Sequence, residues 1–290
     1  MPDAGRTAFV LAGGGSLGAV EVGMLKALAA HGLGADLVVG ASVGAINAAY
    51  YAGRPTVAGV DALDAIWRKL ETKDVFPFSP VKGFFGFVGW QDAFVDPGPL
   101  ERLFRRAIPY QRLEDATLPC HIVATDVLDG SEVVLSSGPV VPALMASAAI
   151  PGVFPPVEHE GRTLFDGGVA SNTPIATAIE KGARRVIVLP TGYSCALKTP
   201  PRGAIALALH ALNLMIVHQL VTEIERFRHR AEIVVVPPLC PVESSPYDFG
   251  ATASLIDRAE ASTKTWLATG GIHRHDVPVE LPPHGHGLAP

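Results

Sequence analysis

The stretch DLVVGASVGAINAAYYAG, residues 36–53, decides the fold because it contains a strand, a sharp turn and a helix in direct succession. The turn is G-x-S-x-G, with Ser42 between Gly40 and Gly44. In this context the pattern is typical of a nucleophile elbow, in which side chains at the two glycines would collide with the neighbouring strand and helix. The positive end of the following helix would favour an alkoxide or an oxyanion at Ser42. The alternative is that Ser42 only caps an ordinary helix.

Working outward, apolar runs of strand length alternate with helical runs along the chain, at residues 7–12, 35–40, 120–125, 132–135, 184–190 and 231–236. Strands of this kind, separated by helices, predict a three-layer α/β fold with a largely parallel central sheet and helices on both faces. We expect residues 1–270 to form one domain. The Pro- and His-rich residues 271–290 are expected to form a flexible tail.

The composition excludes some classes of protein. A net charge of −5 over 290 residues argues against a nucleic-acid binder and gives no general attraction to anionic membranes. Cys120, Cys195 and Cys240 are far apart and form no C-x-x-C pair, so neither a disulfide framework nor a zinc cluster is expected. This cysteine usage suits a reducing compartment. We therefore expect a cytoplasmic protein that meets membranes at most peripherally.

Residues 203–221 are the longest apolar segment and carry no formal charge, so their length approaches that of a membrane span. Polar side chains interrupt the segment, and apolar residues recur at helical spacing from Ile205 to Phe227. The pattern favours an amphipathic helix that faces the core.

A second glycine-rich turn lies in VLAGGGSLGAV, residues 10–20, and fits G-x-G-x-x-G. A dinucleotide site needs an acidic residue about 20 positions later, but Val38, Val39 and Gly40 stand there, and no G-K-[ST] completes a P-loop. The loops after two adjacent parallel strands lie side by side. We therefore expect the amides of Gly13, Gly14 and Gly15 to form an oxyanion hole beside Ser42.

The nucleophile also needs a proton acceptor. The histidines fall in the long helical segment or the tail, and none occupies an obvious loop after a strand. Asp166, in LFDGGVASNTPI, follows a short apolar run and precedes Gly167 and Gly168, which allow close backbone approach. It is the preferred partner of Ser42. Asp126 and Asp129 are competing carboxylates, whose alternative role is to stabilise a turn.

Taken together, GGGSLG, GASVG, DGG and ASAAIPGVFPPV (146–157) resemble the motifs of the bacterial patatin-like phospholipases, from about residue 7 to 190. The resemblance implies a Ser42–Asp166 dyad and hydrolysis of carboxylic esters of lipids, by a phospholipase A, lipid acyl hydrolase or esterase. It also implies that neither a metal nor a cofactor takes part. Many members carry Arg or Lys where this chain has Leu17, and leucine cannot attract a phosphate.

Residues 74–99 contain seven of the chain's 20 aromatic residues, punctuated by glycine and proline. They are expected to form an irregular apolar lip over a pocket, with Phe84, Phe85 and Phe87 as candidates for holding an acyl chain. The alternative is a loop whose rings complete the core. The expected partner is a lipid or acyl ester. A non-catalytic lipid-binding or scaffold protein that keeps the fold is the competing interpretation.

Overall fold

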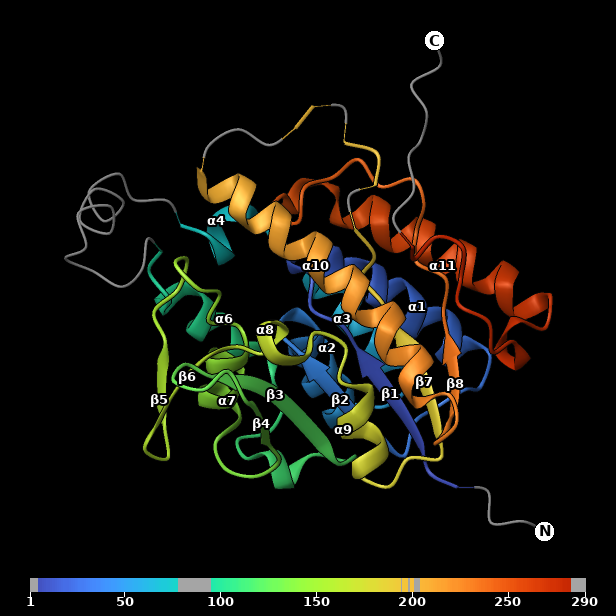
Figure 1. The fold of residues 1–290 in the computed structure, drawn as a ribbon, viewed down its shortest axis with the longest axis horizontal. Coiled ribbons are helices and arrows are strands. Elements are labelled where there is room, and N and C mark those ends of the chain that lie inside the picture. Colours follow the sequence, from blue (N-terminus) through green and yellow to red (C-terminus); the bar gives the residue numbers. More distant parts are fainter. Residues whose placement is uncertain (1–4, 78–94, 194, 198, 201–203, 283–290) are drawn as a thin grey trace.

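The computed structural model describes residues 5–77, 95–193, 195–197, 199–200 and 204–282, apart from several side chains between residues 204 and 218. Within this part of the chain, one eight-stranded sheet has the order β5-β6-β3-β2-β1-β7-β8, and β4 also pairs with β3. Figure 1 shows the sheet at the centre of the molecule. Its strands are β1 (Thr7–Leu11), β2 (Leu37–Ala41), β3 (Cys120–Asp126), β4 (Glu132–Leu135), β5 (Val157–His159), β6 (Arg162–Asp166), β7 (Arg185–Leu189) and β8 (Glu232–Val235).

Helices cover both faces of the sheet. They are α1 (Gly18–Ala30), α2 (Val43–Gly53), α3 (Val57–Trp67), α4 (Thr72–Val75), α6 (Gly98–Ala107), α7 (Val140–Ser147), α8 (Gly168–Ser171), α9 (Ile175–Glu180), α10 (Ala204–Phe227) and α11 (Thr252–Ala268). Short 3-10 turns stand at Gly15–Leu17, Leu113–Asp115, Phe249–Ala251 and Gly271–His273.

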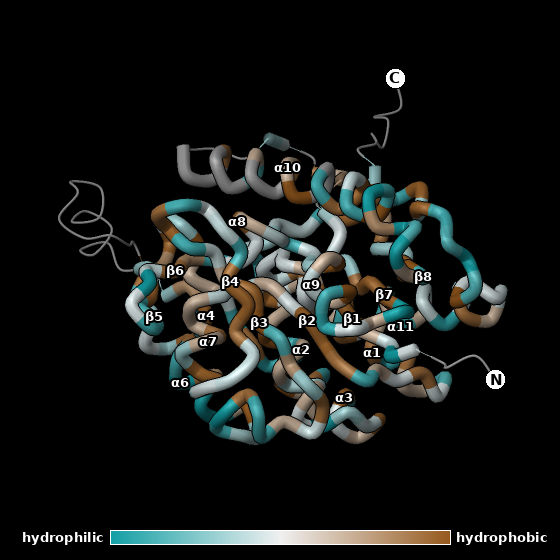
Figure 2. Tube along the Cα trace, turned by 60° about the horizontal axis from the view of Figure 1, so that its bottom comes forward, coloured by the Kyte–Doolittle hydropathy of each residue, from teal (hydrophilic) through white to brown (hydrophobic). Residues whose placement is uncertain are grey.

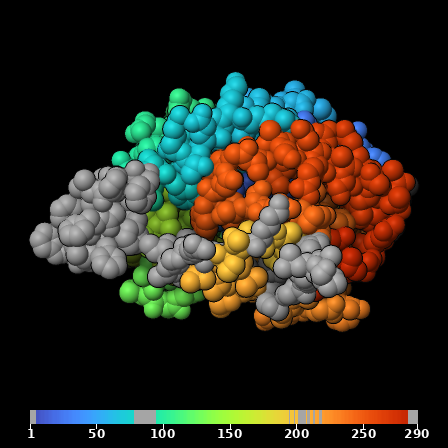
Figure 3. Space-filling view, turned by 90° about the horizontal axis from the view of Figure 1, so that it is seen from above, coloured from blue at the N-terminus to red at the C-terminus, as the bar shows by residue number. Residues whose placement is uncertain are grey.

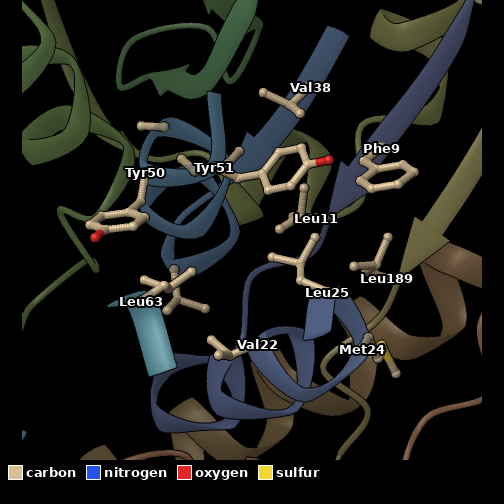
Figure 4. Packing of buried hydrophobic residues seen from close by; sticks show 14 of the residues in the cluster. Phe9, Leu11, Val22, Met24, Leu25, Val38, Tyr50, Tyr51, Leu63 and Leu189 are labelled. Atoms are coloured by element: carbon tan, nitrogen blue, oxygen red, sulfur yellow. The ribbon is translucent and has the colours of Figure 1, made fainter. Parts of the chain in front are cut away.

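Alternate residues of each strand enter two separate apolar clusters. In β1, Phe9 and Leu11 pack with residues of α1, α2, α3 and α11, whereas Ala8 and Val10 pack with residues of α9 and α10. Figure 4 shows the first cluster, where the Phe9 ring stacks on Tyr51 of α2 at a centroid distance of 5.6 Å. The apolar strands run through the middle of the molecule (Figure 2). A sheet buried on both faces explains why its strands read as continuous apolar runs.

The strand registers place the last residues of β2 and β6 next to each other along β3. β2 runs parallel to β3 and its last residue, Ala41, pairs with Val123. β6 runs antiparallel to β3 and its last residue, Asp166, pairs with Ala124. β4 pairs with β3 across Val123 and Ala124 as well, and therefore occupies the other side of β3. The ends of β2 and β6 consequently meet on one side of β3, which sets Ser42 next to Asp166.

The predicted three-layer α/β fold is confirmed, with one difference in the sheet. The strands β8, β7, β1, β2 and β3 are parallel, but β4, β5 and β6 form an antiparallel edge. Strands β5 and β6 span only three and five residues, too few for a clear hydrophobic period. The sequence therefore predicted neither their direction nor their pairing.

The long apolar segment forms α10 over Ala204–Phe227. Its Leu220, Ile224 and Phe227 are buried, as the helical spacing predicted, whereas Leu207 and Met215 are 51% and 69% exposed. Among the described residues, none of the helices combines the length and apolar character needed to cross a membrane.

The expectation of a flexible tail from residue 271 is wrong as far as residue 282. Ile272 and Leu281 are buried, and the Arg185 guanidinium donates a hydrogen bond to the Ile272 carbonyl at 2.9 Å. Leu281 belongs to the apolar cluster that contains α9 and α10 residues, so burial of two apolar side chains holds this segment to the domain. Residues 283–290 lie outside the described chain, as do residues 78–94 of the predicted lip, with Phe84, Phe85 and Phe87.

Candidate active site

Ser42 stands at the turn between β2 and α2 with a φ of 53°, a strained value for a residue with a side chain. A Cβ at Gly40 would collide with the Gly44 carbonyl, and one at Gly44 would collide with the Leu11 carbonyl. The steric reason expected for both glycines therefore holds. The Ser42 side chain makes no capping hydrogen bond to α2, so the alternative of an ordinary helix cap does not describe this serine.

The Ser42 hydroxyl donates a 2.6 Å hydrogen bond to Asp166 Oδ2. Both side chains are buried, with 8% and 6% of their residues' surface exposed. The other carboxylate oxygen, Oδ1, accepts a 2.8 Å hydrogen bond from the Gly168 amide. Burial raises the pKa of Asp166 to about 6, against the lowering effect of the hydrogen bonds from Ser42 and Gly168. The site thus joins a hydroxyl to a carboxylate that is more basic than usual yet ionised at neutral pH.

Ser147, at the end of α7, was missed by the sequence reasoning. Its hydroxyl oxygen accepts a 2.9 Å hydrogen bond from the Ser42 amide, and the hydroxyl donates to the Val123 carbonyl at 2.6 Å. The Ser147 carbonyl also accepts from the Gly167 amide at 3.2 Å. Ser147 therefore links the Ser42 turn to the Asp166 turn. The available signal was its place in ASAAIPGVFPPV, the stretch that resembled the fourth family block.

Gly13 does not fit the predicted role of oxyanion donor. Its amide donates to the Asn172 carbonyl at 3.1 Å, and its carbonyl accepts from the Asn172 and Thr191 side chains at 3.3 and 2.8 Å. Gly13 is therefore a fixed point of the loop. The backbone amide contact could not be identified from the sequence, because Asn172 follows Gly13 by 159 residues.

The far end of the same loop is held as firmly. The Ser16 amide donates to the Pro246 carbonyl at 2.7 Å, and the Ser16 hydroxyl donates to the Ser245 carbonyl at 3.1 Å. Between the two anchors, the amides of Gly14 and Gly15 have no acceptor among the residues that the structure describes. Gly15 has a φ of +59°, which glycine adopts without strain. Two donors are thus left available next to Ser42.

The competing carboxylates have other partners. Asp126 accepts a hydrogen bond from the Leu128 amide and lies 3.5 Å from the Arg162 guanidinium, and Asp129 accepts from the Ser131 amide. Both stabilise the turn between β3 and β4, as their alternative role predicted. Leu17 is fully buried in the core and lines neither of the cavities at Ser42.

Within the part of the chain that the structure describes, Ser42 lines two cavities. One, of about 520 Å³ including its open mouth, is lined by Asp166, Gly14, Gly15 and Asn172, and also by Val169, Ile216 and Tyr247. The other, of about 740 Å³ on the same basis, is almost wholly apolar, with side chains from α2, α3, α6 and the loop before β5. Its lining includes Ile46, Leu63, Trp67, Phe76, Phe104 and Phe154. Of the predicted aromatic segment, Phe76 is thus part of an apolar pocket.

A family model described as "Patatin-like phospholipase" matches residues 9–179. The chain belongs to this family. The resemblance found in the sequence is therefore confirmed at the level of the family.

The relatives carry related names. Human "Patatin-like phospholipase domain-containing protein 6" is 30% identical over 191 residues, which cover 64% of this chain and 13% of that protein. "Lysophospholipase NTE1" of the yeast Kluyveromyces lactis is 26% identical over 196 residues, 63% of this chain and 12% of that protein. The chain thus matches a small part of much longer relatives.

Among solved structures, VipD from Legionella pneumophila gives a TM-score of 0.46 at 15% identity, covering 91% of this chain and 67% of that one. Human GIVD cytosolic phospholipase A2, in complex with methyl gamma-linolenyl fluorophosphonate, gives 0.47 at 13% identity, covering 92% and 58%.

Proposed function

We propose that this protein hydrolyses carboxylic ester bonds of lipids, with Ser42 as the nucleophile and Asp166 as its proton acceptor. The observation that carries the proposal is the buried 2.6 Å hydrogen bond between the two side chains at a strained turn. Membership of the patatin-like phospholipase family supports it. A catalytically idle scaffold would have no need for a strained serine that is hydrogen-bonded to a carboxylate of raised pKa.

The reaction runs in two steps. Asp166 accepts the hydroxyl proton as Ser42 Oγ attacks the acyl carbonyl, and the amides of Gly14 and Gly15 donate to the tetrahedral oxyanion. The leaving alcohol takes the proton from Asp166, which produces an acyl-enzyme. Asp166 then accepts a proton from water, the resulting nucleophile attacks the acyl carbonyl, and Ser42 is released with its proton restored.

The two cavities are proposed to bind different parts of the substrate. The apolar cavity suits the acyl chain, since every methylene removed from water contributes about 0.8 kcal/mol. The smaller cavity contains the carboxylate and the free amides, and suits the leaving alcohol and the incoming water. Because both open on Ser42, an ester with its acyl chain in one and its alcohol in the other would present its carbonyl to Ser42 Oγ.

The test is a panel of p-nitrophenyl esters and phospholipids with the wild type and Ser42→Ala. We expect ester cleavage by the wild type and its loss in the variant, with unchanged thermal unfolding. A fluorophosphonate probe should attach to Ser42 and leave the variant unlabelled. A folded wild type that neither cleaves esters nor reacts with the probe would contradict the proposal and favour the scaffold.

An enzyme that acts on lipids in membranes or vesicles must bind to the lipid surface, and α10 offers a suitable apolar face. Its exposed Leu207, Ala211, Leu214 and Met215 recur at helical spacing on one face, and no charged residue occurs on the helix before Glu223. Ile216, the next residue after Met215, lines the smaller cavity, and so does the exposed Val169 of α8. This surface lies on the exterior of the molecule (Figure 3). We propose that it rests on the lipid surface, so that lipids enter beside Ser42.

Vesicle sedimentation tests this contact. Met215→Glu should weaken binding to phosphatidylcholine vesicles about tenfold or more and leave cleavage of a water-soluble acetyl ester unchanged. Val57→Glu is the control, because Val57 is also exposed, at 52%, but begins α3, which follows the end of α2 that is remote from Ser42. Equal binding by the wild type and Met215→Glu would contradict the contact.

A further inference from the structure

The loops after β7 and β8 come together at two cysteines that the mechanism does not use. Cys195 lies in the first loop and Cys240 in the second, 45 residues later, and their sulfur atoms are 3.9 Å apart. The Val242 amide donates to Cys195 Sγ at 3.4 Å, and the Ala196 amide donates to the Val242 carbonyl at 3.1 Å. The two loops are therefore already joined at this point. This contact could not be predicted from the sequence, because the two thiols are 45 residues apart along the chain.

These two loops also hold both ends of the segment from Gly13 to Ser16, which we call the oxyanion loop. Thr191, in the loop after β7, donates to the Gly13 carbonyl at 2.8 Å. Pro246, in the loop after β8, accepts from the Ser16 amide at 2.7 Å. Any change in the distance between the two loops therefore bears on Gly14 and Gly15, which lie between the anchors.

We propose that Cys195 and Cys240 form a reversible disulfide that fixes these two loops relative to one another and thereby controls the oxyanion loop. The oxidant is a small disulfide such as oxidised glutathione. One thiolate attacks it and releases one reduced glutathione, and the second thiolate then attacks the mixed disulfide and releases another. The protein gives up two electrons and two protons, and one glutathione disulfide becomes two thiols.

The geometry favours this pair over other thiols. A disulfide needs a sulfur separation of about 2.05 Å, so the two sulfur atoms must approach by about 2 Å, which loops allow more readily than strands. Both side chains are partly exposed, so a small oxidant reaches them. Cys120 is the internal control: it is buried in β3, and burial raises the pKa of its thiol to about 12.

Peptide mapping tests the disulfide directly. The reduced full-length protein is exposed to oxidised glutathione at pH 8.5, because burial and the neighbouring Cys195 raise the pKa of the Cys240 thiol to about 11. Remaining thiols are then alkylated and the protein is digested with trypsin. We expect peptides 186–198 and 231–258 to be linked, while Cys120 is alkylated. Alkylation of both Cys195 and Cys240, or separate glutathione adducts on each that never resolve, would overturn the proposal.

Two variants separate the pair from its single thiols. Cys195→Ser and Cys240→Ser each retain one thiol of the pair, so each should stop at a mixed disulfide that small thiols remove. A linked peptide in either variant would show that another cysteine is the partner, and would refute the pairing.

The effect on the site rests on the proposed hydrolase function. Oxidation should lower kcat for p-nitrophenyl butyrate about tenfold or more, since displacements near 1 Å in an active site are costly, and dithiothreitol should restore it. Cys240→Ser should keep its kcat in oxidised glutathione. An oxidised, linked wild type with full kcat would refute control of the oxyanion loop. A reduced protein inactive on every ester would instead refute the hydrolase, and peptide mapping would still decide the disulfide.

Discussion

Asp166→Asn is expected to stop turnover and to stabilise the folded protein. Asparagine matches aspartate in size: its Oδ1 can still accept from the Gly168 amide and its Nδ2 can donate to Ser42 Oγ, but it cannot accept the serine proton. We expect kcat to fall at least about 10³-fold, as for loss of a general base. The same change removes a buried charge, so the variant is expected to be more stable than the wild type although it is inactive.

The magnitude follows from the pKa of Asp166. The rise from the ordinary value of 3.8 to about 6 means that ionising the folded protein's carboxyl costs about 3 kcal/mol more than ionising it in the unfolded chain. This cost is absent well below pH 3.8 and complete above pH 6. The wild type therefore loses stability relative to Asp166→Asn as the pH rises. About 2 kcal/mol of the difference should develop between pH 4.5 and pH 8.

The assay is urea unfolding of both proteins at several pH values, with p-nitrophenyl butyrate turnover measured on the same samples. Asp129→Asn is the control, because Asp129 is exposed in a turn and has no contact with Ser42. Its turnover should match the wild type. A stability difference between Asp166→Asn and the wild type that does not change with pH would refute the buried, desolvated carboxylate. Retained ester hydrolysis by Asp166→Asn would refute the dyad.

Three further predictions concern the site. The kcat/KM of the wild type should rise between pH 5 and 7 with an apparent pKa near 6, because only ionised Asp166 accepts the proton; a flat profile would contradict this. Ser147→Ala should lower kcat about tenfold or more with little change in KM, since Ser147 holds the Ser42 amide, and Ser147→Thr should recover part of it; equal losses in both would argue for a packing defect. Ile46→Trp should lower cleavage of octanoyl esters more than of acetyl esters by filling the apolar cavity, and equal losses would contradict its assignment to the acyl chain.

The sequence sufficed for the parts of the site that depend on local chain geometry. G-x-S-x-G between an apolar strand and a helix required a strained turn at Ser42, and parallel strands required the Gly13–Gly15 loop to lie beside it. The two-residue glycine run after Asp166 indicated close approach to another segment. In the structure, a Cβ at Gly167 would collide with the Val123 carbonyl of β3. Positions where a side chain would collide require glycine, and a glycine pattern is visible in the sequence, so these residues could be predicted.

Contacts between segments that are distant in the sequence have no such residue pattern and could not be predicted. The amide of Gly13 is occupied because the Asn172 carbonyl happens to lie opposite, and backbone carbonyls belong to every residue type. Serine is among the commonest residues in proteins, so Ser147 does not stand out until its contact with the Ser42 amide is seen. The sequence likewise hides the direction of β6, because a five-residue strand pairs either way.

The raised pKa of Asp166 sets a balance that a serine–aspartate pair without histidine must strike. At the ordinary 3.8, the carboxylate would be about a hundredfold weaker as a base than at a pKa near 6. Without the hydrogen bonds that the carboxylate accepts, the same burial would raise the pKa further and leave more of the carboxyl protonated at neutral pH, unable to accept a proton. The hydrogen bonds from the Ser42 hydroxyl and the Gly168 amide stabilise the charged form and oppose that rise. Burial thus supplies the basicity, and the two hydrogen bonds limit the rise, so that at a pKa near 6 about nine-tenths of the carboxylate is ionised at pH 7.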